Sequence, residues 1–148
     1  MDSCWKFLNL NPSGGIAPDC TTRTLAFCLG QDYSEIKEHQ IRISQAVSGR
    51  KSHWNAFYVL ECILINSNWT RIVLARKIVR RKLAKMLEKV LVKVMTESYE
   101  HVSPIYKGKI YDTWDCSGGR VHALMFPLEE SNKILQKLDE NGIKYVLD

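Results

Sequence analysis

Apolar residues follow two different spacings along this chain, and the change between them divides the sequence into two regions. Up to residue 65, apolar residues recur every three or four positions, a spacing that predicts amphipathic helices. We expect three helices there, at residues 21–29, 32–47 and 52–65. Gly30 is the expected end of the first helix, because glycine readily takes the left-handed conformation that terminates helices.

Short runs of strand-forming residues dominate the second region. We expect strands at residues 70–74, 91–95, 99–106, 109–114, 120–125 and 143–147, and helices at residues 78–89 and 129–140. Helices followed by antiparallel strands indicate the α+β class, and 148 residues suit one domain. We therefore expect a single domain over residues 1–148, in which N-terminal helices pack on a C-terminal antiparallel sheet.

A hairpin in this second region brings together side chains that can do chemistry. A two-residue loop at residues 107–108 sets His101 opposite Trp114 on the facing strand. Because side chains alternate along a strand, His101, Asp112 and Trp114 then share one face, and Asp115 lies on the other. A loop one residue different would exchange Asp112 and Asp115, so both carboxylates remain candidates, with Asp112 favoured.

Cys20 is the candidate nucleophile that would complete such a site. It follows the glycine-rich loop at residues 11–18 and lies in the first turn of a predicted helix, with Asp19 as the expected N-cap. A helix N-terminus and a nearby imidazolium both lower the pKa of a thiol. His101 would be the base, Asp112 would orient its ring, and backbone N–H groups including that of Cys20 would bind an oxyanion.

The other cysteines and histidines have less distinctive positions. Cys28 and Cys62 lie on apolar helix faces and are expected in the core. Cys116 follows a strand, where a structural or exposed role is more common than a catalytic one. His122 alternates within a predicted strand and is the alternative candidate for the base.

Two segments resemble a known family. Residues 11–33, N-P-S-G-G-I-A-P-D-C-T-T-R-T-L-A-F-C-L-G-Q-D-Y, and residues 101–117, H-V-S-P-I-Y-K-G-K-I-Y-D-T-W-D-C-S, resemble small papain-fold proteins of bacteria and their phages. Those proteins form part of the papain-like cysteine peptidase superfamily. The resemblance implies a papain-like fold and a Cys–His pair at Cys20 and His101, and it implies no substrate.

Three positions depart from the family pattern. Glu100 precedes His101 where the relatives usually have glycine, and Pro104 interrupts the strand that follows. Papain has a glutamine ahead of its cysteine for the oxyanion hole, and no glutamine precedes Cys20. Asn11 or backbone N–H groups would have to replace it.

The residues and the resemblance together lead to a first hypothesis about function. We expect a small thiol hydrolase that cleaves a peptide, isopeptide or related amide. Cys20 attacks, His101 transfers the proton and Asp112 orients the imidazole; this chemistry requires no cofactor and no metal.

The charge distribution supports a second hypothesis. The formal charge of +5 is concentrated in the segment Arg71–Lys93, where Glu88 is the single acid. If its basic residues project to solvent from one helix, they form either a solvated face or a surface for nucleic acid or an acidic protein. The chain would then be a catalytically idle papain-fold binding protein, for example a phage anti-defence factor. The basic residues expected to project are Arg80, Arg81, Lys82, Lys85 and Lys89.

Composition narrows the cellular setting. No apolar run approaches the about 20 residues needed to span a bilayer, and no signal peptide is evident, so we expect no membrane association. Five widely spaced cysteines without a C-x-x-C pair indicate reduced thiols rather than disulfides or a zinc site. We expect a cytoplasmic protein of a bacterium or of a phage-infected host cell.

Overall fold

One mixed sheet organises the fold. The computed structural model describes residues 4–14, 19–48 and 56–147, and in these residues the strand order is β1-β5-β4-β3-β6-β2-β7. The strands are β1 (Trp5–Phe7), β2 (Trp69–Val79), β3 (Val94–Glu97), β4 (Val102–Tyr106), β5 (Lys109–Asp112), β6 (Arg120–Pro127) and β7 (Tyr145–Leu147). Neighbouring strands are antiparallel except for β1, which runs parallel to β5.

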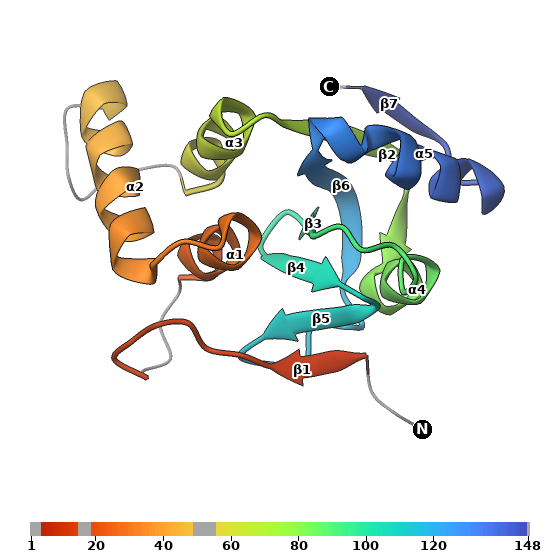
Figure 1. Cartoon of the computed structure of the whole chain (residues 1–148), viewed down its shortest axis with the longest axis horizontal. Helices are drawn as coiled ribbons and strands as arrows, with labels where there is room; N and C mark the ends of the chain where they lie inside the picture. The colour runs from red at the N-terminus through yellow and green to blue at the C-terminus, as the bar shows by residue number, and fades with distance from the viewer. Residues whose placement is uncertain (1–3, 15–18, 49–55, 148) are drawn as a thin grey trace.

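Helices cover both faces of this sheet (Figure 1). The helices are α1 (Cys20–Leu29), α2 (Tyr33–Ser48), α3 (Ala56–Asn66), α4 (Arg80–Met86) and α5 (Ser131–Glu140), with a short 3-10 helix η1 (Leu128–Glu130) before α5. The first three pack on one face, and α4 and α5 pack on the other. The α+β class is confirmed, but the N-terminal helices cover only one face of a sheet that is not wholly antiparallel.

Strand alternation separates the interior into two apolar clusters. In β3, Val94 lies in the cluster under α4 and α5, and its neighbour Met95 lies in the cluster under α1–α3. Leu124 and Met125 of β6 divide in the same way. Because successive side chains point to opposite faces, a central strand covered on both sides buries side chains in both clusters.

Buried polar contacts fix α1 against its neighbours. Gln40 of α2 is fully buried, accepts a hydrogen bond from Thr22 Oγ1 at 2.6 Å and donates one to Thr21 Oγ1 at 3.3 Å. Thr24 Oγ1 donates to the carbonyl of Val102 in β4 at 3.4 Å. The start of α1 is therefore held beside the start of β4.

The predicted hairpin is confirmed. Tyr106 pairs with Lys109 across a two-residue loop in which Lys107 and Gly108 have φ of 51° and 76°. Positive φ at both positions is what a type I′ turn requires. Gly108 also lacks room for a side chain, because a Cβ there would lie 2.6 Å from the Cβ of Glu88. The paired strands are shorter than expected, however, and end before His101 and Trp114.

The basic segment is where the sequence prediction was wrong. A strand was expected at residues 70–74 and a helix at 78–89, whereas β2 extends to Val79 and α4 spans only Arg80–Met86. A register shift in the pairing of β2 with β6 lies between Val73 and Ile78. No strand was expected at β1. The predicted start of the third helix, at residue 52, lies outside the described residues.

No helix among the described residues is long and apolar enough to cross a bilayer.

Candidate active site

The first member of the site is Cys20, at the start of α1. The helix begins at this residue, as predicted, and Gly30 ends it in the left-handed conformation. The side chain of His101 and the backbone N–H of Val102 lie close enough to the Cys20 thiol to lower its pKa. The candidate nucleophile and the candidate base are therefore neighbours.

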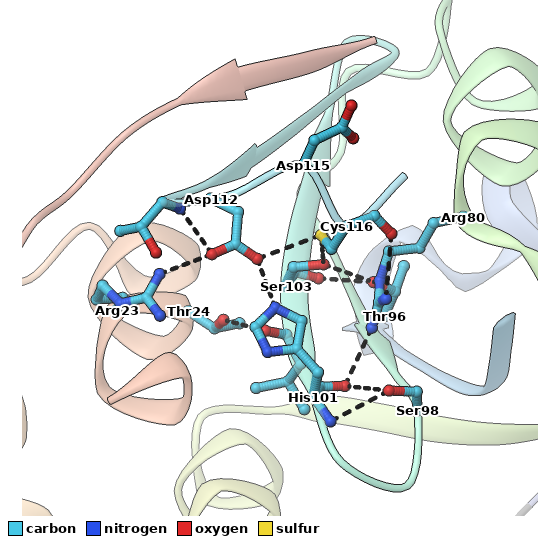
Figure 2. A network of polar contacts seen from close by, with 12 residues as sticks. Arg23, Thr24, Arg80, Thr96, Ser98, His101, Ser103, Asp112, Asp115 and Cys116 are labelled. Atoms are coloured by element: carbon cyan, nitrogen blue, oxygen red, sulfur yellow. Dashed lines mark hydrogen bonds and ion pairs between the residues drawn. The ribbon is translucent and has the colours of Figure 1, made fainter. Parts of the chain in front are cut away.

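His101 is the second member and is fixed through both its ring and its backbone. Its Nε2 lies 2.5 Å from Asp112 Oδ2 (Figure 2). Its backbone N–H donates to Ser98 Oγ at 3.1 Å, and its carbonyl accepts from Ser98 Oγ at 2.9 Å. The turn between β3 and β4 thus holds the imidazole at the entrance of β4.

Asp112 at the end of β5 is the third member, and it is almost fully buried. The prediction that Asp112 rather than Asp115 faces His101 is confirmed. Asp115 is exposed and accepts a hydrogen bond from the backbone N–H of Ser117 at 3.0 Å. The two-residue hairpin loop decides between the two carboxylates, as argued from the alternation of side chains.

Arg23 is a site residue that the sequence analysis missed. Its Nη1 donates to Asp112 Oδ1 at 2.8 Å, and its Nε donates to Asp19 Oδ1 at 2.7 Å (Figure 2 shows the contact with Asp112). Tyr33 Oη donates to Asp19 Oδ2 at 2.6 Å, which fixes that carboxylate in turn. The spacing of Asp19 and Arg23, four residues apart at a helix start, was the available signal.

Asp19 does not act as the helix cap that was expected. It occupies the N-cap position, but its side chain makes no capping hydrogen bond and binds Arg23 and Tyr33 instead. The side-chain amide of Asn11 donates to Asp19 as well, at 3.2 Å. The first N–H groups of a helix have no carbonyl partner within it. The backbone N–H of Cys20 is therefore a better candidate oxyanion donor than the side chain of Asn11.

The electrostatics of the site favour a charged pair. Burial raises the pKa of the Cys20 thiol, but the hydrogen bonds from His101 and Val102 and the charges of His101 and Arg23 outweigh it and leave that pKa lowered. Burial lowers the pKa of His101, and hydrogen bonds with Asp112, Cys116 and Cys20 reverse this and raise it to about 11. Both shifts favour a proton on His101 and a thiolate at Cys20.

Asp112 remains ionised near neutral pH. Burial opposes its charge, but hydrogen bonds from His101 and Arg23, together with the positive charge of His101, lower its pKa to about 2. A permanently ionised carboxylate on Nε2 leaves the other ring nitrogen of His101 to exchange a proton with Cys20.

Cys116 also contacts the site, in the loop that follows β5. It is buried, and its thiol lies 3.2 Å from Asp112 Oδ2 and 3.6 Å from Ser103 Oγ. The sequence predicted a structural or exposed residue here. Burial agrees with the structural role, and the contact with the carboxylate was not predicted.

Three of these side chains form the cluster best suited to a metal in the described part of the chain. The ligand atoms of His101, Asp112 and Cys116 all lie within 4.8 Å of one another. The contact of 2.5 Å between His101 and Asp112 is a hydrogen-bond distance, whereas tetrahedral zinc separates its ligand atoms by more than about 3 Å. Arg23 already occupies the other oxygen of Asp112. The cluster suits proton exchange better than a cation.

Arg80 was expected on the surface and is in fact the largest side chain of the described core, only 1% exposed. Its Nε donates to Thr96 Oγ1 at 2.9 Å, its Nη2 to the His101 carbonyl at 3.0 Å and its Nη1 to the Cys116 carbonyl at 3.5 Å (Figure 2). A Cβ on Gly119 would lie 2.7 Å from Nη1, so the glycine makes room for the guanidinium.

Trp114 covers one side of the imidazole. The ring centroids of His101 and Trp114 are 4.9 Å apart, and the ring planes are tilted by 47°. Trp114 is half exposed, which agrees with the predicted shared face even though the paired strands end earlier.

His122, the alternative base, lies apart from Cys20. Its Nε2 is 3.8 Å from Glu97 Oε1, and its ring stacks on Tyr99 with centroids 4.2 Å apart. We therefore exclude His122 as the partner of Cys20 in this conformation.

Comparison with known proteins adds no identification to this geometry. The chain matches no protein-family model, no curated protein and no solved structure.

Proposed function

We propose that this protein is a thiol hydrolase that cleaves a peptide, isopeptide or related amide bond. The observation that carries the proposal is the position of His101, which binds Asp112 at 2.5 Å and lies close enough to Cys20 to lower the pKa of the thiol. A nucleophile, a base and an orienting acid in contact are the arrangement that activates a thiol for acyl transfer.

The reaction follows from the charge state of the pair. The Cys20 thiolate attacks the carbonyl carbon, and the carbonyl oxygen becomes an oxyanion that the backbone N–H of Cys20 can stabilise. The imidazolium of His101 gives its proton to the leaving amine as the C–N bond breaks, which leaves a thioester on Cys20. His101 then takes a proton from water, whose attack on the thioester breaks the C–S bond, releases the acid and regenerates the Cys20 thiolate beside the His101 imidazolium.

We propose a papain-like arrangement for this site. The nucleophile opens the first long helix, that helix packs against the strand that follows the base, and the acid lies at the end of the next strand. The two segments with local resemblance to papain-fold proteins carry the same three residues in the same order.

The experiment is labelling with an electrophilic amide-mimic probe, followed by mass-spectrometric mapping. We expect labelling of Cys20 in the native chain, none in Cys20→Ala, and full labelling in the control variant Cys62→Ala, which removes a half-buried thiol outside the site. Equal labelling of Cys20→Ala and the native chain would contradict the proposal.

A second candidate function rests on a separate cavity of about 370 Å³. It lies between β2, α4 and the loop before β7, and four of its lining residues are basic: Arg76, Lys77, Lys82 and Lys144. None of the lining residues is acidic. Such a cavity suits the phosphate groups of nucleic acid. Of the predicted helical patch, Arg81, Lys82, Lys85 and Lys89 are exposed as expected, whereas Arg80 is buried.

Salt-dependent binding of labelled oligonucleotides tests this second candidate. Arg76, Lys82 and Lys144 are changed together to Glu, and the control changes three exposed lysines outside the cavity, Lys6, Lys37 and Lys89. We expect the cavity variant alone to abolish binding, since each lost phosphate contact removes about one unit from the salt slope. Equal loss in both variants would indicate only a general effect of net charge, and capture of acidic proteins alone would point to the other class of partner.

A further inference from the structure

Arg80 carries a buried charge that no carboxylate neutralises directly. All three of its hydrogen-bond acceptors are neutral, namely one hydroxyl and two backbone carbonyls. No carboxylate of the described residues lies within ion-pair distance of it, and a guanidinium stays protonated in proteins. Burying such a charge is costly unless negative charge elsewhere compensates it.

The compensating charge lies in the site itself. Burial lowers the pKa of Arg80, and the interactions that oppose this and favour its charged form come from Cys116, Asp112 and Cys20. Asp112 is already shared by Arg23 and His101, and Cys116 is a thiol that donates to Asp112. The Cys20 thiolate is the anion left without a full positive partner.

A count of charges makes the same point. With the proton on His101, the negative groups of the network are Asp19, Asp112 and Cys20, and the positive groups are Arg23 and His101. The network then lacks one positive charge. Arg80 supplies it from the opposite face of the sheet.

Arg80 also touches the segments that hold the site. Its guanidinium binds the carbonyl of His101 itself and that of Cys116, which contacts Asp112. Thr96 of β3 anchors the near end of the guanidinium, and Gly119 leaves the space for its far end. The guanidinium is therefore held in one place and cannot turn toward solvent.

We propose that Arg80 is a positioning residue whose buried charge balances the Cys20 thiolate and whose hydrogen bonds fix the backbone of His101. The inference rests on the proposed function, because it takes Cys20 as the attacking thiol. It explains why a basic residue of α4 lies inside the protein, when its neighbours Arg81 and Lys82 are exposed.

Other charged groups near Cys20 are accounted for by their own partners. They are Asp19 and Arg23 of α1, His101 before β4, Asp112 of β5 and Cys116 in the loop after it, with Tyr33 of α2 on Asp19. On β3 and α3, Glu97 and Glu61 both pair with Arg71. Arg80 is the one charge of this group with neutral partners alone among the described residues.

The test measures the pH dependence of iodoacetamide alkylation at Cys20, mapped by mass spectrometry. Arg80→Met should raise the apparent thiol pKa by roughly one unit, the effect of one partly screened charge at the distance of a neighbouring side chain. Arg81→Met removes the same charge from the adjacent exposed position and should shift the apparent pKa of the Cys20 thiol by less than about 0.3 units. Arg80→Lys keeps the charge and should restore most of the native profile.

A second neutral variant and two defined outcomes make the test decisive. If Arg80→Met does not fold, Arg80→Gln retains an amide donor for the two carbonyls without the charge, and the same upward shift is expected. A folded neutral variant with the native profile overturns the proposal, and so does an Arg80→Lys profile shifted as far as the neutral variants. Because no substrate is used, a failure to find any hydrolysed amide counts against the proposed function and leaves this measurement intact.

Discussion

Two histidines of this protein have nearly the same surroundings and opposite charge states. His101 and His122 have side chains that are 13% and 14% exposed, and each lies within 4 Å of a carboxylate that is more deeply buried. Each ring is also covered by an exposed aromatic side chain. Yet the pKa of His101 is raised to about 11 and that of His122 is lowered.

The difference between the two histidines lies in the hydrogen-bond partners of the neighbouring carboxylate. Asp112 presents one oxygen to Arg23 and the other to His101 at 2.5 Å. Both oxygens of Glu97 accept from Arg71 at 3.3 Å, and His122 remains 3.8 Å away. Burial lowers the pKa of His122, Glu97 opposes this only weakly, and Arg71 and Lys77 reinforce it. Asp112 therefore hydrogen-bonds with its histidine directly, whereas Glu97, held by Arg71 through both oxygens, only approaches His122.

The largest expected effect comes from Asp112→Asn. It removes the carboxylate that holds the proton on His101, so we expect alkylation of Cys20 at pH 6–7 to slow by roughly ten- to a hundredfold. The unfolding free energy should also fall by about 3–5 kcal/mol, because Arg23 loses a partner in a buried site. Alkylation kinetics and urea unfolding measure the two effects.

Glu97→Gln is the matched change at the second histidine. It likewise breaks a buried pair, here with Arg71, so stability should fall while Cys20 alkylation changes by less than about twofold. Equal slowing in both variants would mean that the alkylation rate reports only general stability.

The next effect concerns the pH dependence of stability, and its sign follows from counting protons. Unfolded cysteine and histidine titrate near 9.0 and 6.5, whereas the folded thiol pKa is lowered and that of His101 is raised to about 11. Above 6.5 and above the lowered folded pKa of the thiol, up to pH 9.0, the folded and unfolded pair each hold one proton, so the pair adds no slope. Above 9.0 the unfolded thiol releases its proton while His101 keeps its own up to about 11, so stability falls as pH rises.

Cys20→Ser should make the unfolding free energy depend on pH in the range where the native pair adds no slope. Without the thiol, folded His101 still binds a proton that the unfolded chain releases above pH 6.5, so the unfolding free energy should decline from there up to the folded pKa of His101. The slope can reach about 1.4 kcal/mol per pH unit relative to the native chain. Urea unfolding at three pH values under reducing conditions measures it, and parallel curves for the two proteins would rule out the charged pair.

A smaller effect is expected at His122. Glu97 is the one neighbour that raises the pKa of His122, so Glu97→Gln should lower that pKa further, by less than about one unit. Proton NMR of the imidazole signals separates the two histidines. A His122 signal that titrates above 6.5 in the native protein would remove the contrast from which the comparison starts.

These contrasts also show how far the sequence could predict the site. The hairpin is local: a glycine in a two-residue loop fixes the register, and the register places Asp112 rather than Asp115 on His101. Cys20 at a helix start is likewise a local signal. The burial of Arg80 cannot be predicted from the local sequence. It depends on β2 extending to Val79, because α4 then begins at Arg80 and its first side chain points inward.

The ion pairs between residues far apart in the sequence could not be predicted either. Arg23 meets Asp112 over 89 positions of sequence, and Arg71 meets Glu97 over 26, so neither pairing follows from helical or strand spacing. The basic residues of the segment Arg71–Lys93 were expected to form either a solvated face or a binding surface, because composition does not distinguish an exposed cation from one with a buried partner.

The smallest expected effect concerns the two aromatic covers. Trp114, 52% exposed, shields the hydrogen bond between His101 and Asp112, and Trp114→Ala should admit water to it and weaken it. An aromatic contact of this kind is worth about 0.5–1.5 kcal/mol, which corresponds to a two- to tenfold slower alkylation of Cys20 at pH 6–7. Tyr99→Ala uncovers His122 by the same kind of change and should leave the Cys20 rate as it is, because no contact connects His122 with Cys20. If Tyr99→Ala slows Cys20 as much as Trp114→Ala does, the two histidines are coupled, and their opposite charge states cannot be assigned to their own carboxylates.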